Sequence, residues 1–196
     1  ITVNIEEYNL DLIRQTFYFP QDGFEVKNNW LYFNNIPLKD LIEEYGTPLR
    51  ITYLPKISQQ IQKAKKWFSD AIDELDYNGK YYYCYCTKSS HFAHVLDEAL
   101  RNDIHLETSS AYDIDIVERL YLNKRITKNT YIICNGFKTN VYTQRISKLA
   151  NLGFNIIPVL DNKEELKEYD DRIINEVNIG IRIAAEEQPE FQLYTS

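Results

Sequence analysis

Glycine is scarce in this chain, and the glycine-rich signatures of phosphate-binding loops are missing. Only six glycines occur among 196 residues, and neither GxGxxG nor GxxxxGK[ST] is present. Both motifs depend on glycine because backbone amides must come close to a phosphate group. The GxSxG turn that exposes a serine nucleophile is absent as well. These absences argue against dinucleotide-binding, P-loop and serine-hydrolase sites.

The sequence also lacks long apolar runs and an excess of basic charge. No stretch approaches the ~20 apolar residues that cross a bilayer, and the N-terminus has neither the basic nor the hydrophobic region of a signal peptide. The net charge is −7, so no basic stripe is available to neutralise nucleic-acid phosphates. We therefore expect a cytoplasmic protein with no membrane or nucleic-acid partner, whose charge mildly favours a cationic small molecule.

Methionine is absent, and cysteine is rare. The three cysteines, Cys84, Cys86 and Cys134, lie in apolar runs, which favours reduced core thiols over a disulfide framework. The Cys-x-Cys pair has no second ligand cluster at zinc-like spacing, and His91 and His94 have no carboxylate partner, so we expect no metal site. Because the chain starts with isoleucine and has no methionine, we interpret it as a piece of a longer product.

A repeat of strand-like runs dominates the sequence after residue 78. The runs KYYYCYC, IHLET, TYIIC, NIIPVL and NIGIRI begin at residues 80, 104, 130, 155 and 178, and segments with helical apolar spacing separate them. Strands that alternate with helices imply parallel pairing and right-handed crossovers, as in a (β/α)8 barrel or a doubly wound sheet. Five strands complete a doubly wound sheet but are three short of a barrel, so length alone favours the sheet.

The region before the repeat has a different pattern. Apolar residues spaced three and four apart predict a long helix over 57–75. Residues 24–54 predict short strands and a short helix, with turns at Asn28-Asn29, Asn34-Asn35 and Gly46. We therefore divide the chain into a lead-in, 1–54, that contributes strands to a second, all-β domain, and a βα region, 55–196.

Polar residues follow every strand of the repeat. They are Lys88; Glu107 with Ser109 and Ser110; Asn135-Gly136; Asp161-Asn162; and Glu186-Glu187. In both candidate architectures the carboxyl ends of the strands form the ligand face, so these residues together predict a site. Ser90, Ser110 and Asn162 also stand where helix N-caps are expected, and capping is the alternative interpretation of each.

Lys88 is the strongest candidate for a reactive group. Side-chain alternation places Cys84, Cys86 and Lys88 on one face of the first strand, with the cysteines lining a barrel interior beneath the lysine. A lysine above an apolar floor is desolvated and becomes a neutral nucleophile that can attack a carbonyl, whereas Glu107 on the next strand opposes that shift. The alternative is a surface lysine that closes a strand.

Several segments together resemble a known enzyme family. YGTPL at 45–49, the long helix, the strand ending in TKS, the following HLETSS and YIICNGFK at 131–138 resemble the pyridoxal-phosphate decarboxylases of basic amino acids with an alanine-racemase-type barrel. ICNGFK at 133–138 is similar to a stretch characteristic of biosynthetic arginine decarboxylases. The resemblance covers about residues 24–196 and implies an α/β fold. In place of the doubly wound sheet, it implies a partial (β/α)8 TIM-type barrel of about five βα units, truncated after the fifth strand, with N-terminal strands belonging to a second β domain.

The resemblance also implies roles for single residues. Lys88 matches the lysine that holds pyridoxal phosphate as an internal aldimine, and Glu107 matches an acidic catalytic residue near it. Cofactor-binding positions besides Lys88 are Cys86, Ser110, Asn135 and Gly136, and Asp113 continues the pattern after Ser110. Ala184 stands where some relatives have a histidine that stacks on the cofactor ring.

The implied reaction is decarboxylation of a basic amino acid, with arginine giving agmatine for polyamine biosynthesis, in a homo-oligomer (a dimer or higher). Other parts of the family's site lie beyond Ser196 in relatives, so a chain ending there is expected to be inactive. The alternatives are a decarboxylase acting on diaminopimelate, ornithine or carboxynorspermidine, a non-catalytic pyridoxal-phosphate-binding relative, and a plain doubly wound domain.

Overall fold

Two Asn-Asn pairs shape the N-terminal part of the structure, a computed structural model that describes residues 23–183. Asn28, Asn29, Asn34 and Asn35 all have positive φ, between 47° and 64°. Two-residue hairpin turns of type I′ need this conformation at both central positions, and asparagine adopts it more readily than most residues. The pairs connect three short antiparallel strands: β1 (Phe24–Lys27), β2 (Trp30–Phe33) and β3 (Ile36–Pro37).

Helix α2 (Leu38–Tyr45) follows these strands and ends at Gly46, whose φ is 79° and whose N–H donates to the Ile42 carbonyl. The predicted strands, short helix and turns of this region are therefore confirmed. The chain divides into two units between Thr52 and Tyr53, and these elements belong to the first. Whether they complete a second β domain stays a prediction.

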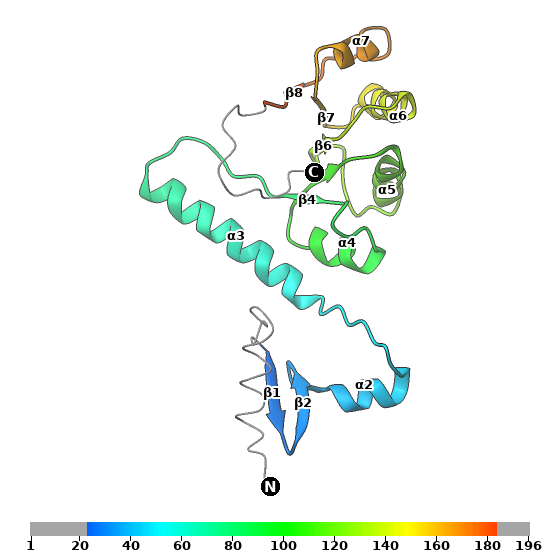
Figure 1. Cartoon of the computed structure of the whole chain (residues 1–196). Helices are drawn as coiled ribbons and strands as arrows, with labels where there is room; N and C mark the ends of the chain where they lie inside the picture. The colour runs from blue at the N-terminus through cyan, green and yellow to red at the C-terminus, as the bar shows by residue number, and fades with distance from the viewer. Residues whose placement is uncertain (1–22, 184–196) are drawn as a thin grey trace, which may run out of the picture. The chain divides into compact units, whose positions relative to one another are not determined.

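The second unit begins with α3 (Pro55–Glu74) and then alternates strands with helices (Figure 1). The strands are β4 (Cys84–Cys86), β5 (His105–Thr108), β6 (Ile132–Cys134), β7 (Ile156–Leu160) and β8 (Gly180–Ile181). The helices between them are α4 (Ala93–Leu100), α5 (Ala111–Leu122), α6 (Asn140–Asn151) and α7 (Glu164–Asp170). All five predicted strands and the long helix are present, with narrower bounds for the strands.

The order of the strands distinguishes the two candidate architectures. The sheet runs β4-β5-β6-β7-β8, and every neighbouring pair is parallel. A doubly wound sheet reverses its strand order at a switch point, and no reversal occurs among these strands. Figure 1 shows α4, α5, α6 and α7 along the same side of the strands. The partial barrel is therefore confirmed, and the preference for a doubly wound sheet, based on length alone, is wrong.

Alternation along the strands gives the sheet a buried face and a more open face. Leu106, Ile132, Cys134 and Ile156 face the helices and are at most 2% exposed, in a core with residues of α5 and α6. The residues between them, such as Ile133, are only partly buried. Helix α3 packs on α4 through a smaller cluster of Ile61, Ala99 and Ile104. The helices thus cover one face of the sheet.

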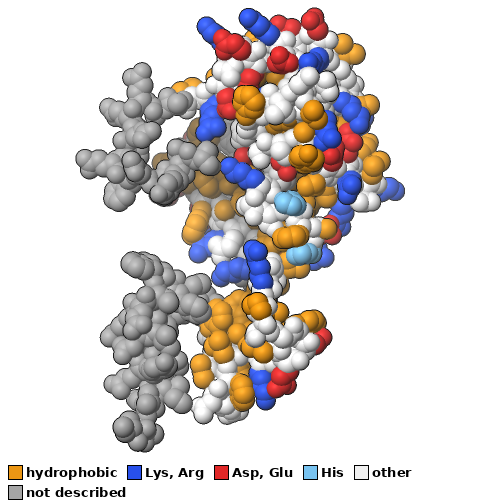
Figure 2. All heavy atoms as spheres, turned by 45° about the vertical axis from the view of Figure 1, so that its right-hand side comes forward, with side chains coloured by type: hydrophobic (Ala, Val, Ile, Leu, Met, Phe, Trp, Pro, Cys, Tyr) orange, Lys and Arg blue, Asp and Glu red, His pale blue; other side chains and the backbone are white. Residues whose placement is uncertain are grey.

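Ion pairs connect successive helices on the outside of the second unit. Arg125 binds Asp97 of α4 at 2.8 Å, and the α6 residues Arg145 and Lys148 bind Asp115 and Glu118 of α5 at 2.6 and 2.7 Å. Figure 2 shows the resulting mixture of basic and acidic side chains over this face. Within residues 23–183, no helix is both long and apolar enough to cross a membrane.

Candidate active site

The predicted site residues follow three neighbouring strands at the carboxyl edge of the sheet. Cys86 of β4 lies opposite Glu107 of β5, and Glu107 lies opposite Ile133 of β6, which precedes Asn135 by two residues. Parallel strands present their carboxyl ends at one edge, so the loops that carry Lys88, Ser110 and Asn135 emerge together. Strand pairing therefore brings the predicted residues to one side of the molecule.

Cys86 and Glu107 share the more open face of the sheet, as predicted. The Cys86 thiol donates to the Glu107 carboxylate over 3.7 Å. Burial and the Glu107 charge raise the pKa of Cys86, whereas the backbone N–H and the positive charge of Lys88 lower it. Burial and Glu107 also raise the pKa of Cys84. Glu107 is thus a carboxylate among neutral thiols, with Lys88 close enough to act on the same sulfur.

The side chains on the opposite face of the first strand are directed toward the helices. Thr87 is completely buried, and its hydroxyl donates to the Glu107 carbonyl over 3.1 Å. Tyr85 packs against the core and donates from its hydroxyl to the Ser90 carbonyl over 3.0 Å. These contacts fix the register that directs Cys86 and Glu107 away from the helices.

Lys88 is exposed, which corrects the expectation that it is desolvated above an apolar floor. The ladder of β4 stops at Cys86, and a turn over 87–89 carries the lysine beyond the end of the strand. Among the described residues, no hydrogen bond joins Lys88 to Glu107. A lysine held at a strand end in this way presents its amine to a ligand that approaches the carboxyl edge.

Ser110 caps helix α5. Its hydroxyl accepts from the Asp113 N–H over 3.3 Å and donates to the Asp113 carboxylate over 3.1 Å, and the Ser109 N–H donates to the same carboxylate over 2.9 Å. This reciprocal arrangement satisfies N–H groups that have no partner within the first turn of the helix. The capping interpretation of Ser110 is therefore confirmed, and its contact with a cofactor stays a prediction.

The Asn135-Gly136 loop is held close to the preceding loop. The Asn135 N–H donates to the Thr108 carbonyl over 2.9 Å. Gly136 has a φ of 79°, and a Cβ atom there would lie 2.8 Å from the Ser109 carbonyl oxygen. Glycine is therefore required at this position by both the backbone conformation and the space available.

The other residues at strand ends have different outcomes. The Asn162 side chain accepts from the Glu165 N–H over 3.1 Å, but Lys163 occupies the N-cap position of α7, so Asn162 precedes the N-cap position by one residue. Ser90 is not the N-cap of α4, because the helix begins later and Phe92 occupies that position without a side-chain bond. Ala184, Glu186 and Glu187 lie outside the described residues.

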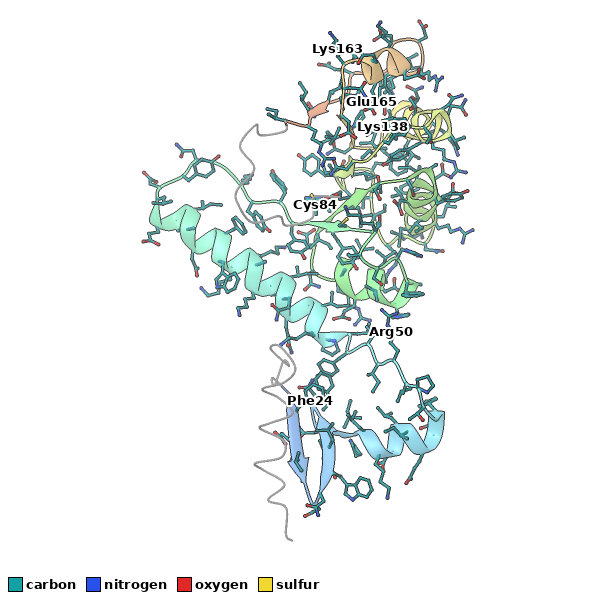
Figure 3. All side chains as sticks on the ribbon, viewed as in Figure 1. Phe24, Arg50, Cys84, Lys138, Lys163 and Glu165 are labelled. Carbon is teal, nitrogen blue, oxygen red and sulfur yellow. The ribbon has the colours of Figure 1, made fainter. Side chains whose placement is uncertain are left out.

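A buried ion pair between the β6–α6 loop and helix α7 was not predicted. The Lys138 side chain is fully buried, and its ammonium donates to the Gly136 and Val159 carbonyls over 2.6 and 2.7 Å, with Glu165 4.0 Å away. Figure 3 shows Lys138 and Glu165. Burial lowers the pKa of Lys138, and the negative charge of Glu165 opposes this shift. A lysine in a loop is usually exposed, so the sequence provided no reason to expect burial. The one signal that could have drawn attention to Lys138 is its place in the ICNGFK segment.

The histidines have packing roles. His105 accepts from the Tyr131 N–H over 3.1 Å, and burial lowers its pKa. The rings of His91 and His94 stack on Phe92 at 5.8 and 5.6 Å. In the part of the chain from 23 to 183, no three His, Cys, Asp or Glu side chains are grouped as a metal site would need.

The architecture defines a class of protein: a partial parallel βα barrel with an exposed lysine just after its first strand. No family model matches the chain. Biosynthetic arginine decarboxylase of Prochlorococcus marinus is 25% identical over 170 residues, which cover 81% of this chain and 26% of that protein. The enzyme of the same name from Vibrio vulnificus (strain YJ016) is 24% identical over 196 residues, 90% of this chain and 30% of that protein.

Solved structures share the fold. Biosynthetic arginine decarboxylase SpeA of Campylobacter jejuni matches with a TM-score of 0.67 and 22% identity, over 84% of this chain and 30% of that one. Diaminopimelate decarboxylase of M. jannaschi matches with a TM-score of 0.68 and 19% identity, over 87% of this chain and 38% of that one. The resemblance seen in the sequence is confirmed: the chain is related to biosynthetic arginine decarboxylases and has the fold of barrel decarboxylases. It spans about a quarter of the length of the first of these relatives.

Proposed function

We propose that the protein is a pyridoxal-phosphate-dependent decarboxylase of a basic amino acid, with arginine as its substrate and agmatine as its product, in polyamine biosynthesis. The observation that carries the proposal is the exposed amine of Lys88 at the end of the first strand of a partial barrel. Similarity to enzymes named biosynthetic arginine decarboxylase supports the choice of substrate. Free thiols in apolar surroundings accord with a reducing compartment, and we place the protein in the cytoplasm.

The described residues provide part of what the cofactor needs. Lys88 offers an amine for the aldehyde group of pyridoxal phosphate. Gly136 leaves the β6–α6 loop without a side chain beside Ser109. Pyridoxal phosphate, when bound, would accept the electron pair released as carbon dioxide leaves. Glu107 would supply a negative charge near the lysine, and Cys86 would donate a hydrogen bond to that carboxylate. By the resemblance to the family, we also propose a homo-oligomer.

The direct test is to find which lysine carries the cofactor. The intact protein would be incubated with pyridoxal phosphate and reduced with borohydride, and the modified peptide would be identified by mass spectrometry. We expect the label on Lys88, its loss in Lys88→Ala, and its retention in Lys124→Ala, which removes an exposed lysine after α5. A label on another lysine, or none on a folded protein, contradicts the proposal.

A second candidate is a barrel decarboxylase with another substrate, because diaminopimelate decarboxylase shares the fold with a TM-score of 0.68. Release of carbon dioxide from arginine, diaminopimelate, ornithine and carboxynorspermidine by the intact protein separates the candidates. A labelled Lys88 without turnover of any of them would indicate a non-catalytic cofactor-binding relative.

A further inference from the structure

A fully buried lysine beside the proposed cofactor loop has no role in the reaction as proposed above. The Lys138 side chain is 0% exposed, and the side chain of its partner Glu165 is 7% exposed. Buried charges are costly to keep unless they are paired and hydrogen-bonded. The contacts of this pair therefore need an explanation beyond surface charge.

The two side chains bind backbone groups of neighbouring segments. The Lys138 ammonium donates to the carbonyl of Val159 in β7, the strand that precedes the helix of Glu165. In return, the Glu165 carboxylate accepts from the Lys138 N–H over 3.4 Å and from the Asp161 N–H over 3.1 Å. Lys138 of the β6–α6 loop thus binds the backbone of strand β7, and Glu165 of α7 binds the backbone of the β6–α6 and β7–α7 loops, so the pair joins these two loops.

The same ammonium also holds Gly136. It donates to the Gly136 carbonyl over 2.6 Å, while a Cβ atom at Gly136 would lie only 2.8 Å from the Ser109 carbonyl oxygen of the preceding loop. Gly136 is therefore fixed on one side by the β5–α5 loop and on the other by Lys138. The ammonium lies 5.7 Å from the ring of Tyr142 in α6, so Lys138 supports the loop from the helix side of the sheet.

We propose that Lys138 and Glu165 form a buried brace that holds the Asn135-Gly136 loop in place for cofactor binding, which makes Lys138 a positioning residue. The inference rests on the proposed function, because it assigns this loop to the cofactor site. Outer-shell partners of metal ligands typically change affinity by a factor of about 10–100 when they are replaced, and we expect an effect of similar size here.

The test separates positioning from stability with two variants of the intact protein. Lys138→Met removes the ammonium and leaves the Glu165 charge buried without a counter-charge, so we expect it to lower the midpoint of chemical denaturation strongly. Lys138→Met combined with Glu165→Gln removes both charges, so we expect most of the stability to return. The Gly136 and Val159 carbonyls still lack a donor in the double variant, so its loop stays loose.

Two measurements on the double variant then decide. The affinity for pyridoxal phosphate, measured by equilibrium dialysis, should be at least about tenfold weaker than in the wild type. Hydrogen exchange of the cofactor-free protein should be faster at the amides of 135–138 and unchanged in α5. Lys148→Met, which removes an exposed lysine paired with Glu118, is the control and should change neither.

The outcomes distinguish this inference from the proposed function. Wild-type affinity and unchanged exchange in a folded double variant would overturn the brace while leaving the cofactor assignment intact. A wild-type protein that does not bind pyridoxal phosphate would overturn the proposed function and with it the positioning role, and exchange would then show only whether the loop is held. Weaker binding with faster exchange at 135–138 supports both.

Discussion

The two faces of the β4–β8 sheet are made by the same strands but differ in what they contain. The face toward the helices carries apolar side chains and Cys134 in a closed core. The other face carries Cys86, Glu107 and Ile133, all partly exposed. A shift of one residue in pairing would exchange the two sets. Burial on the helix side therefore fixes the register that places the proposed chemistry on the other side.

The two faces should differ most in how much stability is lost when one of two neighbouring isoleucines in β6 is replaced by alanine. In the chain of 196 residues, Ile132→Ala should lower the free energy of unfolding by about 2–5 kcal/mol, because Ile132 is completely buried. Ile133→Ala should lower it by only about 1 kcal/mol, since Ile133 is partly exposed. Urea denaturation of both variants measures the difference. Equal losses would show that the two faces are equally packed.

The buried thiol of Cys134 should make the free energy of unfolding depend on pH more strongly than the partly buried thiol of Cys86 on the other face. Burial raises the pKa of Cys134 from 9.0 to about 11, so the folded protein keeps a proton that the unfolded chain loses in this range. The free energy of unfolding should therefore be unaffected below pH 9 and fall by about 1.4 kcal/mol per pH unit between pH 9 and about 11.

Substitution of each thiol tests the assignment to Cys134. Cys134→Ala should make the loss of stability above pH 9 shallower, because only the less buried Cys84 and Cys86, whose pKa values are also raised, still contribute there. The buried hydroxyls of Tyr142 and Tyr169, whose pKa values are raised as well, begin to contribute at about pH 10. Cys86→Ala should change the slope less, because Cys86 is only partly buried. Denaturation curves from pH 8 to 11 provide the measurement, and an identical slope in wild type and Cys134→Ala would contradict this account.

A smaller effect should distinguish the two edges of the sheet. Gly136 follows β6 at the carboxyl edge and Gly153 precedes β7 at the opposite edge, with φ values of 79° and 80°. A Cβ atom at Gly153 meets nothing within 4 Å, whereas one at Gly136 meets the Ser109 carbonyl. Gly153→Ala should thus cost about 1 kcal/mol for its backbone alone, and Gly136→Ala about 1 kcal/mol more. Thermal denaturation compares them, and equal costs would mean that the Ser109 loop yields freely.

Local features of the fold could be predicted, because they depend on neighbours in the sequence. The long helix follows from apolar periodicity, and the hairpins follow from Asn28-Asn29 and Asn34-Asn35, which favour left-handed backbone. The choice between barrel and doubly wound sheet could not be made from these patterns, since strand order depends on pairing between distant segments. There the family resemblance was correct and the argument from length was wrong.

The candidate site was predictable in position but not in detail. Alternation placed Cys86 correctly on the face of the first strand that is turned away from the helices, because the period of a strand is fixed. The exposure of Lys88 was missed because the ladder of β4 ends at Cys86, two residues earlier. Lys138 was missed because its burial depends on Val159 and Glu165, which are distant in sequence.

The sequential strand order has a consequence for how this region acquires its structure. Each strand from β5 to β8 pairs with the strand immediately before it in the chain, so most contacts of the sheet join segments that are close in sequence. Pairing between segments that are close in sequence has a smaller loop-closure cost than pairing between distant ones, and N-terminal segments leave the ribosome first. A new strand can thus add to a ladder that already exists, which allows the sheet to grow during synthesis, one unit at a time.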